Sequence, residues 1–90
     1  MRSAVHSNIV LVRLGAEVRR RRKSLDLSQA ALAKIAQVHA NVIGRLERGR
    51  YNPSVSLLCW IAAALDTSLV GLLADAEPMQ RAWREHVKTE

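Results

Sequence analysis

The sequence predicts an all-α protein in which residues 1–90 form a single domain. Apolar side chains recur at intervals of three and four residues along most of the chain, and no segment shows the two-residue alternation of a β-strand. Serine, glycine and proline stand at positions typical of helix ends. Ninety residues supply one modest hydrophobic core, so we expect five packed helices and a sixth at the C-terminal end.

The first helix is predicted over about residues 8–24, and Asp26 and Leu27 end it. Its core-facing stripe repeats at helical spacing and contains one charged residue, Arg22. The apolar members of this stripe are Leu11, Leu14, Val18 and Leu25.

A second helix is predicted to follow Ser28, which is suited to be its N-cap, and to end near Ala36. In this helix we expect Leu32 and Ile35 to face the core. Ala33, which has a small side chain, would allow another helix to approach closely.

A third helix is predicted after a turn at residues 37–38; it starts at His39 or Ala40 and ends at Arg48. Gly49 follows at the position where a left-handed residue commonly ends a helix. The inner face of this helix consists of Val42, Ile43 and Leu46.

The fourth helix, from Val55 to Leu65, follows Ser54 as its N-cap and is apolar on almost all sides. We therefore expect it to be buried at the centre of the domain, with Trp60 as the one large side chain of the core. Cys59 is expected to be a small buried side chain. A single cysteine cannot form an internal disulfide, which fits a reducing cytoplasm.

Two more helices are predicted, over about residues 68–73 and 78–87. The second of these helices carries Met79, Trp83 and Val87 on one apolar stripe, which we expect to be buried against another surface. No apolar run approaches the roughly 18 residues of a membrane span, and the N-terminal segment lacks a convincing signal peptide. We expect a mature cytoplasmic protein without a membrane partner.

The net charge of +6 and the isoelectric point of about 10.8 favour a polyanionic partner. Residues 1–65 carry 11 basic and 3 acidic side chains, whereas residues 66–90 carry 3 basic and 5 acidic ones. No carboxylate pair, Ser-His or Cys-His arrangement or phosphate loop suggests an enzyme. The three histidines are scattered, so we expect no metal, no cofactor and no small-molecule ligand.

The segment from Ser28 to Pro53 carries the strongest functional signal. Two short helices joined by a tight turn, over about residues 28–48, are typical of a helix-turn-helix that places its second helix in the DNA major groove. Outward-facing positions of that second helix are expected to read bases: Ala40, Asn41, Gly44 and Arg45, with His39 at the edge.

Each expected contact has its own chemistry. Asn41 can pair with adenine and Arg45 with guanine. Gly44 either allows a close approach to the groove or is a tolerated defect in the helix. His39 is expected to be a cap or to contact a phosphate or a base edge. Residues after the helix would contact phosphates or remain solvated: Arg48, Arg50 and Asn52.

The motifs SQAALAKIA and ERGRYNPS resemble those of the Cro and repressor-type (XRE-like) helix-turn-helix family, in which the latter reads Glu-Arg-Gly, two variable residues and Asn-Pro-Ser. The resemblance spans about residues 14–73. It implies a five-helix, lambda-repressor-like domain, here with an added C-terminal helix, and a phosphate contact at Gln29 with Ser28 beside it. The sequence departs from the family at Gln37, where glycine is usual, which puts the pose of the third helix in doubt.

The resemblance also implies a structural ion pair between Arg22, on the apolar stripe of the first helix, and Glu47, on the inner side of the third. The other cations of the run from Arg19 to Lys23 are expected to form a solvated face that can also approach the DNA backbone.

Proteins of this family usually bind pseudo-palindromic operators as twofold dimers. We expect residues 68–88 to form the dimerisation region, with the alternative that the last helix folds back on its own core in a monomer. The expected interface residues are Leu69, Val70, Leu72, Leu73, Met79, Trp83 and Val87.

The predicted function is that of a small, nucleoid-associated bacterial or phage transcription regulator that binds double-stranded DNA as a homodimer. Phage repressors, restriction-modification controller proteins and antitoxins all fit the pattern, and operator position would decide between repression and activation. The alternative is a protein-interaction module of the same fold that bridges partners and binds DNA weakly or without specificity.

Overall fold

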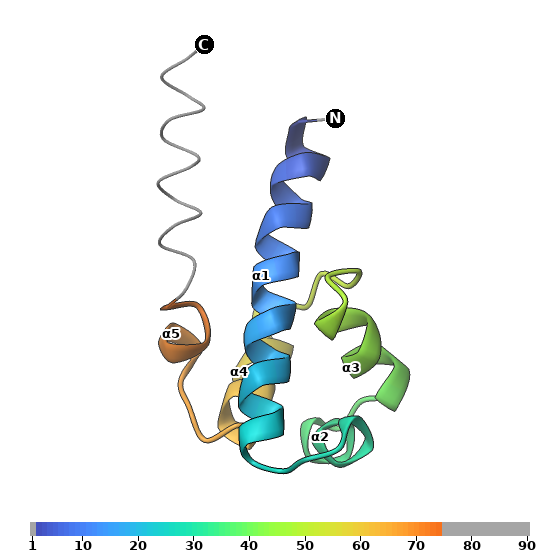
Figure 1. The fold of residues 1–90 in the computed structure, drawn as a ribbon, viewed down its shortest axis with the longest axis vertical. Coiled ribbons are helices and arrows are strands. Elements are labelled where there is room, and N and C mark those ends of the chain that lie inside the picture. The colour runs from blue at the N-terminus through green and yellow to red at the C-terminus, as the bar shows by residue number, and fades with distance from the viewer. Residues whose placement is uncertain (1, 75–90) are drawn as a thin grey trace.

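The computed structural model describes residues 2–74, which form five α-helices and no strand. The helices, in chain order, are α1 (Arg2–Ser24), α2 (Gln29–Ala36), α3 (Ala40–Glu47), α4 (Val55–Ala64) and α5 (Leu69–Leu72) (Figure 1). The predicted all-α fold is therefore confirmed. α1 starts earlier than expected, and the helix predicted over residues 78–87 lies outside the described residues.

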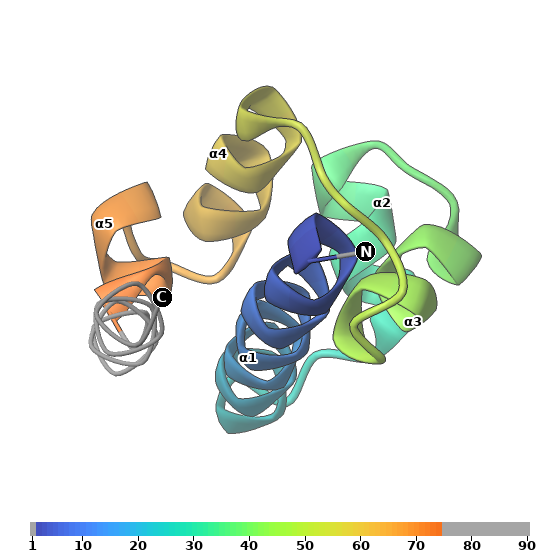
Figure 2. The ribbon, with the colours of Figure 1, turned by 90° about the horizontal axis from the view of Figure 1, so that it is seen from above.

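The helices are arranged around α1. Seen from above, α3 lies on one side of α1 and α5 on the opposite side (Figure 2). α2 packs against both α3 and α4, and α5 packs against α4 and α1. The core at the centre of this arrangement is built from aliphatic side chains of all five helices and of the residue that follows α4: Leu14, Val18, Leu32, Ala33, Ala36, Ile43, Leu46, Leu58, Ile61, Ala62, Leu65 and Leu72.

Serine side chains start three of the helices. The hydroxyl oxygens of Ser28, Ser54 and Ser68 each accept a 3.0 Å hydrogen bond from the backbone N–H three residues later. Each bond satisfies one of the free donors at a helix N-terminus. The predicted caps at Ser28 and Ser54 are confirmed.

Two apolar residues near α2 were wrongly expected in the core. Leu25 is 44% exposed because α1 ends at Ser24, so this residue lies in the connecting turn. Ile35 is 47% exposed because α2 buries Leu32, Ala33 and Ala36. These three positions share one face of a helix, and Ile35 falls beyond its edge.

The expectation for α4 was wrong in the same way. Trp60 is 54% exposed, and Cys59 is exposed as well. α4 buries only one face, with Leu58, Ile61 and Ala62, because its neighbours α2 and α5 cover that side alone. Its outer face lines a surface hollow formed by Val55, Ser56, Cys59, Trp60 and Ala63.

None of the helices in residues 2–74 is long and apolar enough to cross a membrane.

Candidate nucleic-acid interface

The turn between α2 and α3 keeps a left-handed residue although it lacks glycine. Gln37 has φ 61° and ψ 43°, and its backbone N–H bonds to carbonyls at the end of α2. The N–H of Val38 donates to the Ala33 carbonyl at 2.9 Å, which closes the turn. A left-handed non-glycine residue costs about 1–2 kcal/mol, so the remaining fold absorbs this cost and α3 retains the pose of a helix-turn-helix.

The outer face of α3 presents Ala40, Asn41 and Arg45 to solvent. Gly44 does not belong to this face, and the expectation that it is exposed was wrong. A Cβ on Gly44 would lie 3.2 Å from Arg48 Nη1 and 3.5 Å from Gln29 Oε1, so these two side chains cover the glycine.

His39 occupies the N-cap position of α3 with an extended backbone, φ −72° and ψ 149°. Its side chain makes no capping hydrogen bond and is exposed. The imidazole is therefore exposed at the edge of the outer face of α3, as expected from the sequence, but does not act as the cap.

The expected Arg22 and Glu47 pair is present and bidentate. Arg22 Nε donates to Glu47 Oε2 at 2.6 Å, and Arg22 Nη2 donates to Oε1 at 3.0 Å. The two side chains are 10% and 2% exposed. The hydrogen bond to Glu47 raises the pKa of Arg22, against the opposing effect of burial. This ion pair ties α1 to the C-terminal end of α3.

Two further groups complete the polar contacts of this ion pair. Arg22 Nη1 donates to the Leu27 carbonyl at 2.7 Å, and Gln29 Nε2 donates to Glu47 Oε1 at 3.0 Å. No buried side-chain nitrogen or oxygen in the described part of the chain lacks a partner. Gln29, at the first position of α2, is thus half-buried and fixed to α3 through Glu47.

Gly15 brings α1 against the backbone of α3, a contact that the sequence reading missed. A Cβ at this position would lie 2.3 Å from the Leu46 carbonyl oxygen and 2.8 Å from that of Glu47. Only glycine fits such a close approach of two backbones. The signal available in the sequence was a glycine within an otherwise regular helix, where it normally lowers helix propensity.

The end of α3 is fixed by its backbone. Gly49 has φ 72°, as predicted for its position, and its N–H donates to the Leu46 carbonyl. The N–H of Arg50 donates to the Arg45 carbonyl at 2.9 Å. These two bonds form a Schellman motif. The side chains expected beside the groove lie within this motif or two residues after it, and all are exposed: Arg48, Arg50 and Asn52.

Tyr51, which the sequence reading also missed, lies directly after the Schellman motif. Its ring centroid is 5.5 Å from the Cζ of Arg45, which is cation–π distance. The ring is half-buried against the hydrophobic core. The only signal in the sequence was an aromatic residue at one of the two variable positions of the ERGRYNPS motif.

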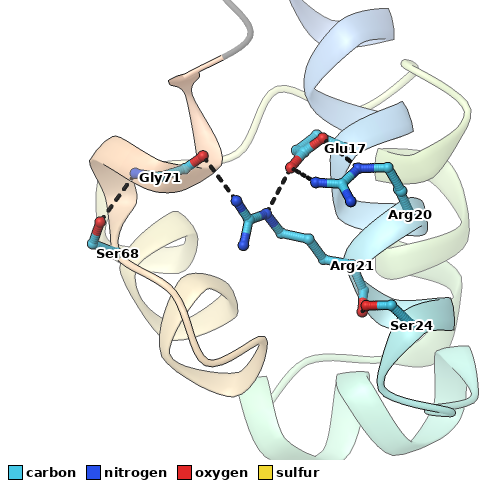
Figure 3. Close-up of polar contacts among 6 residues, drawn as sticks. All are labelled: Glu17, Arg20, Arg21, Ser24, Ser68 and Gly71. Carbon is cyan, nitrogen blue, oxygen red and sulfur yellow. Dashed lines mark hydrogen bonds and ion pairs between the residues drawn. The ribbon is translucent and has the colours of Figure 1, made fainter.

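A second ionic group stands on the opposite side of α1 from α3 (Figure 3). Glu17 is 6% exposed and accepts hydrogen bonds from Arg20 at 2.6 and 3.0 Å and from Arg21 at 2.6 Å. The Arg20 hydrogen bond, followed by that of Arg21, lowers the pKa of Glu17 to about 2 although burial opposes this shift. Arg21 Nη2 also donates to the Gly71 carbonyl at 3.3 Å, so this group ties α1 to α5.

The residues expected at a dimer interface fall into three sets. Leu72 is 1% exposed and belongs to the protomer core, so its assignment to an interface was wrong; it points inward because α5 packs on α1 and α4. Leu69 is half-buried against the core, whereas Val70 is 80% and Leu73 37% exposed. The third set lies outside the described residues: Met79, Trp83 and Val87.

In the described part of the chain, no group of three or more histidine, cysteine or acidic side chains could hold a metal ion.

α2 and α3 are two short helices joined by a turn with one left-handed residue, and asparagine and arginine are exposed on α3. This arrangement defines a helix-turn-helix DNA-binding domain. Residues 18–72 match the family described as Helix-turn-helix (HTH_3), and the chain belongs to this family. Its members are DNA-binding transcription regulators and not enzymes, which agrees with the sequence reading.

Relatives of known role are similar over most of the chain. Control protein C.SmaI of Serratia marcescens is 42% identical over 60 residues, which are 67% of this chain and 71% of C.SmaI. The restriction-modification controller protein C.AhdI of Aeromonas hydrophila has a TM-score of 0.67 at 34% identity, over 69% of this chain and 94% of that chain. The clp gene regulator ClgR of Corynebacterium glutamicum has a TM-score of 0.72 at 28% identity, over 89% of this chain and 88% of that chain.

Proposed function

We propose that this protein is a sequence-specific transcription regulator of the controller type that binds a pseudo-palindromic operator as a homodimer. The observation that carries the proposal is the exposed face of α3 with Asn41 and Arg45, on a helix whose inner side is tied to α1 by the Arg22 and Glu47 ion pair. A reading helix must hold its pose for side chains to meet base edges. The similarity to two controller proteins supports a role in a restriction-modification system.

Within this proposal, the side chains divide into reading and anchoring groups. Asn41 pairs with adenine and Arg45 with guanine, with apolar contact from Ala40 and a further edge contact from His39. The side chain of Arg48 covers Gly44, so the contribution of the glycine is to leave room for that side chain. The N-terminus of α2 with Ser28 and Gln29 binds a phosphate. The phosphate contacts beside the groove come from Arg48, Arg50 and Asn52.

A dimer is part of the proposal because one reading helix covers only a few base pairs. Twofold dimers place two such helices in half-sites about 34–36 Å apart or at a multiple of this distance. Two exposed apolar side chains, Val70 of α5 and Leu73 directly after it, support an interface within residues 68–88. We place the working protein at the nucleoid in the bacterial cytoplasm, where operator DNA is found.

A footprint at two salt concentrations tests this function. The DNA is a fragment recovered from a random library by selection with the same protein. We expect protection of a twofold-symmetric site and an affinity that falls steeply with salt, because each phosphate contact releases counterions. In parallel, Gln29→Ala should weaken binding to all sequences about equally. A folded protein that leaves no footprint at either salt concentration would overturn the proposal and favour a protein-bridging module.

A further inference from the structure

We propose that Tyr51 positions the guanidinium of Arg45 and thereby sets base specificity from outside the reading helix. This inference rests on the proposed reading of DNA by α3. Tyr51 lies in the connection between α3 and α4, where sequence-specific contacts are not otherwise expected. It acts through Arg45 and is therefore a positioning residue.

The backbone holds Tyr51 at a fixed place relative to Arg45. The backbone N–H of Arg50 donates to the backbone carbonyl of Arg45 at 2.9 Å. This hydrogen bond places Tyr51, the next residue, beside the helical turn that contains Arg45. Gly49 makes this return possible with its φ of 72°, and a Cβ there would lie 2.8 Å from Val12 Cγ2. The connection is thus confined between the end of α3 and α1.

The ring of Tyr51 is itself anchored. It is half-buried and packs against the hydrophobic core, whereas Arg45 is exposed. The Cζ of Arg45 lies 5.5 Å from the ring centroid, within the roughly 6 Å at which a cation interacts with an aromatic face. An anchored ring at this distance should favour one rotamer of the exposed Arg45 side chain.

A held guanidinium has a direct consequence for recognition. Two parallel hydrogen bonds to guanine require the guanidinium plane to match the base edge. A free arginine side chain loses much rotamer entropy when it adopts such a geometry, and an ordered one loses less. Tyr51 should therefore strengthen discrimination at the base pair that Arg45 reads and leave the base pair read by Asn41 unchanged.

The test measures base discrimination for variants of Tyr51 on the selected operator and on operators with single base-pair changes. The base pair that Arg45 reads is the one at which Arg45→Ala removes discrimination. We expect Tyr51→Leu to lower discrimination there about 2- to 5-fold, the range of an exposed cation–π contact. Tyr51→Phe keeps the ring and should retain the wild-type value. Tyr51→Met is measured in parallel, because it fills similar space without an aromatic face.

Two controls separate positioning from a general loss of structure. In an Arg45→Ala background, Tyr51→Leu should cause no further loss of discrimination. In the free protein, the ring should shift the NMR signals of the Arg45 side-chain protons, and this shift should persist in Tyr51→Phe and disappear in Tyr51→Leu.

The outcomes are distinguishable from a failure of the proposed function. If the wild type shows no base discrimination at any position, the proposed function itself fails. If the wild type discriminates but Tyr51→Leu and Tyr51→Met discriminate equally well, the positioning role is overturned and the function stands. Tighter or more selective binding by both variants would also overturn it, since the ring would then hold Arg45 away from the groove.

Discussion

α3 and α4 differ in the contacts that hold them and in the surface that they expose. A buried bidentate ion pair and a backbone contact at Gly15 hold α3 against α1. α4 carries no charged residue, and its outer face leaves Trp60 and Val55 54% and 67% exposed. The directional contacts of the ion pair fix the orientation of α3, whereas the exposed apolar area of α4 favours association with another surface.

Substitutions of these two kinds of contact should also have different effects. Removing one partner of a buried ion pair leaves the other charge without compensation, and the whole fold loses stability. Removing an exposed apolar side chain changes only the contacts made with a partner. Substitutions of both kinds therefore distinguish a contact that holds the fold from one that serves association.

Glu47→Ala should lower the free energy of unfolding by about 3–5 kcal/mol, because Arg22 would remain buried with its charge unpaired. Gln29 would also lose the acceptor of its amide hydrogen bond. Urea unfolding or thermal melting measures the loss. The control replaces both partners by methionine, Arg22→Met with Glu47→Met, and should recover most of the stability. A Glu47→Ala variant that melts with the wild type would show that this ion pair does not hold α3.

Gly15→Ala should cost up to about 3 kcal/mol, the upper part of the usual range for overpacking, because its Cβ meets backbone that cannot turn aside. Gly44→Ala is the matched control in another helix. Its Cβ would meet the far end of the flexible Arg48 side chain at 3.2 Å, and alanine favours the helix by about 1 kcal/mol. We expect Gly44→Ala to be close to neutral in thermal melting. Equal effects at the two glycines would contradict the close contact of α1 and α3.

Glu17→Gln tests the link between α1 and α5. The pKa of Glu17 is lowered to about 2 in the folded protein, so its carboxylate adds stability above pH about 4.5, and this contribution is lost as the pH falls from about 4.5 to about 2. At neutral pH we expect a loss of up to about 2 kcal/mol in the variant, reduced by the solvent around the exposed Arg20 side chain. Urea unfolding from pH 7 downward should show the two proteins converging in acid. A constant difference at all pH values would contradict the assigned role of the carboxylate.

Val70→Glu has the smallest expected effect on the fold, within about 0.5 kcal/mol, because the side chain is 80% exposed. Its effect on association should be large, since a charge would enter the proposed interface. Sedimentation equilibrium should show a dimer for the wild type and a monomer for the variant. Val10→Glu, at a 45% exposed valine of α1, is the control and should remain dimeric. The same mass for wild type and Val70→Glu would place the interface elsewhere or remove it.

Much of the fold could be predicted because its signals are local. Serine caps, the glycine after α3 and the spacing of Leu14 and Val18 depend only on neighbouring residues. The exposed face of α4 could not be predicted in this way. A helix that is apolar on all sides has no polar face to orient it, so the sequence does not indicate which side its neighbours cover.

The candidate site could likewise be predicted only in part. The exposure of Ala40, Asn41 and Arg45 on α3 followed from helical geometry, and the Arg22 and Glu47 pair followed from the family resemblance. Gly44 and Tyr51 depend on where long side chains from other segments come to rest, which no spacing rule provides. The Glu17 contacts were accessible in part, because Arg20 and Arg21 follow it at the three- and four-residue spacing of helix ion pairs.

The central claim, that the outer face of α3 reads operator DNA, is tested most directly by selection from a random DNA library with the wild type and with Arg45→Ala. We predict that the wild type enriches a twofold-symmetric sequence. Arg45→Ala should enrich the same sequence without a base preference at one position of each half-site. If the wild type enriches no sequence, or if Arg45→Ala retains every base preference, α3 does not read DNA as proposed.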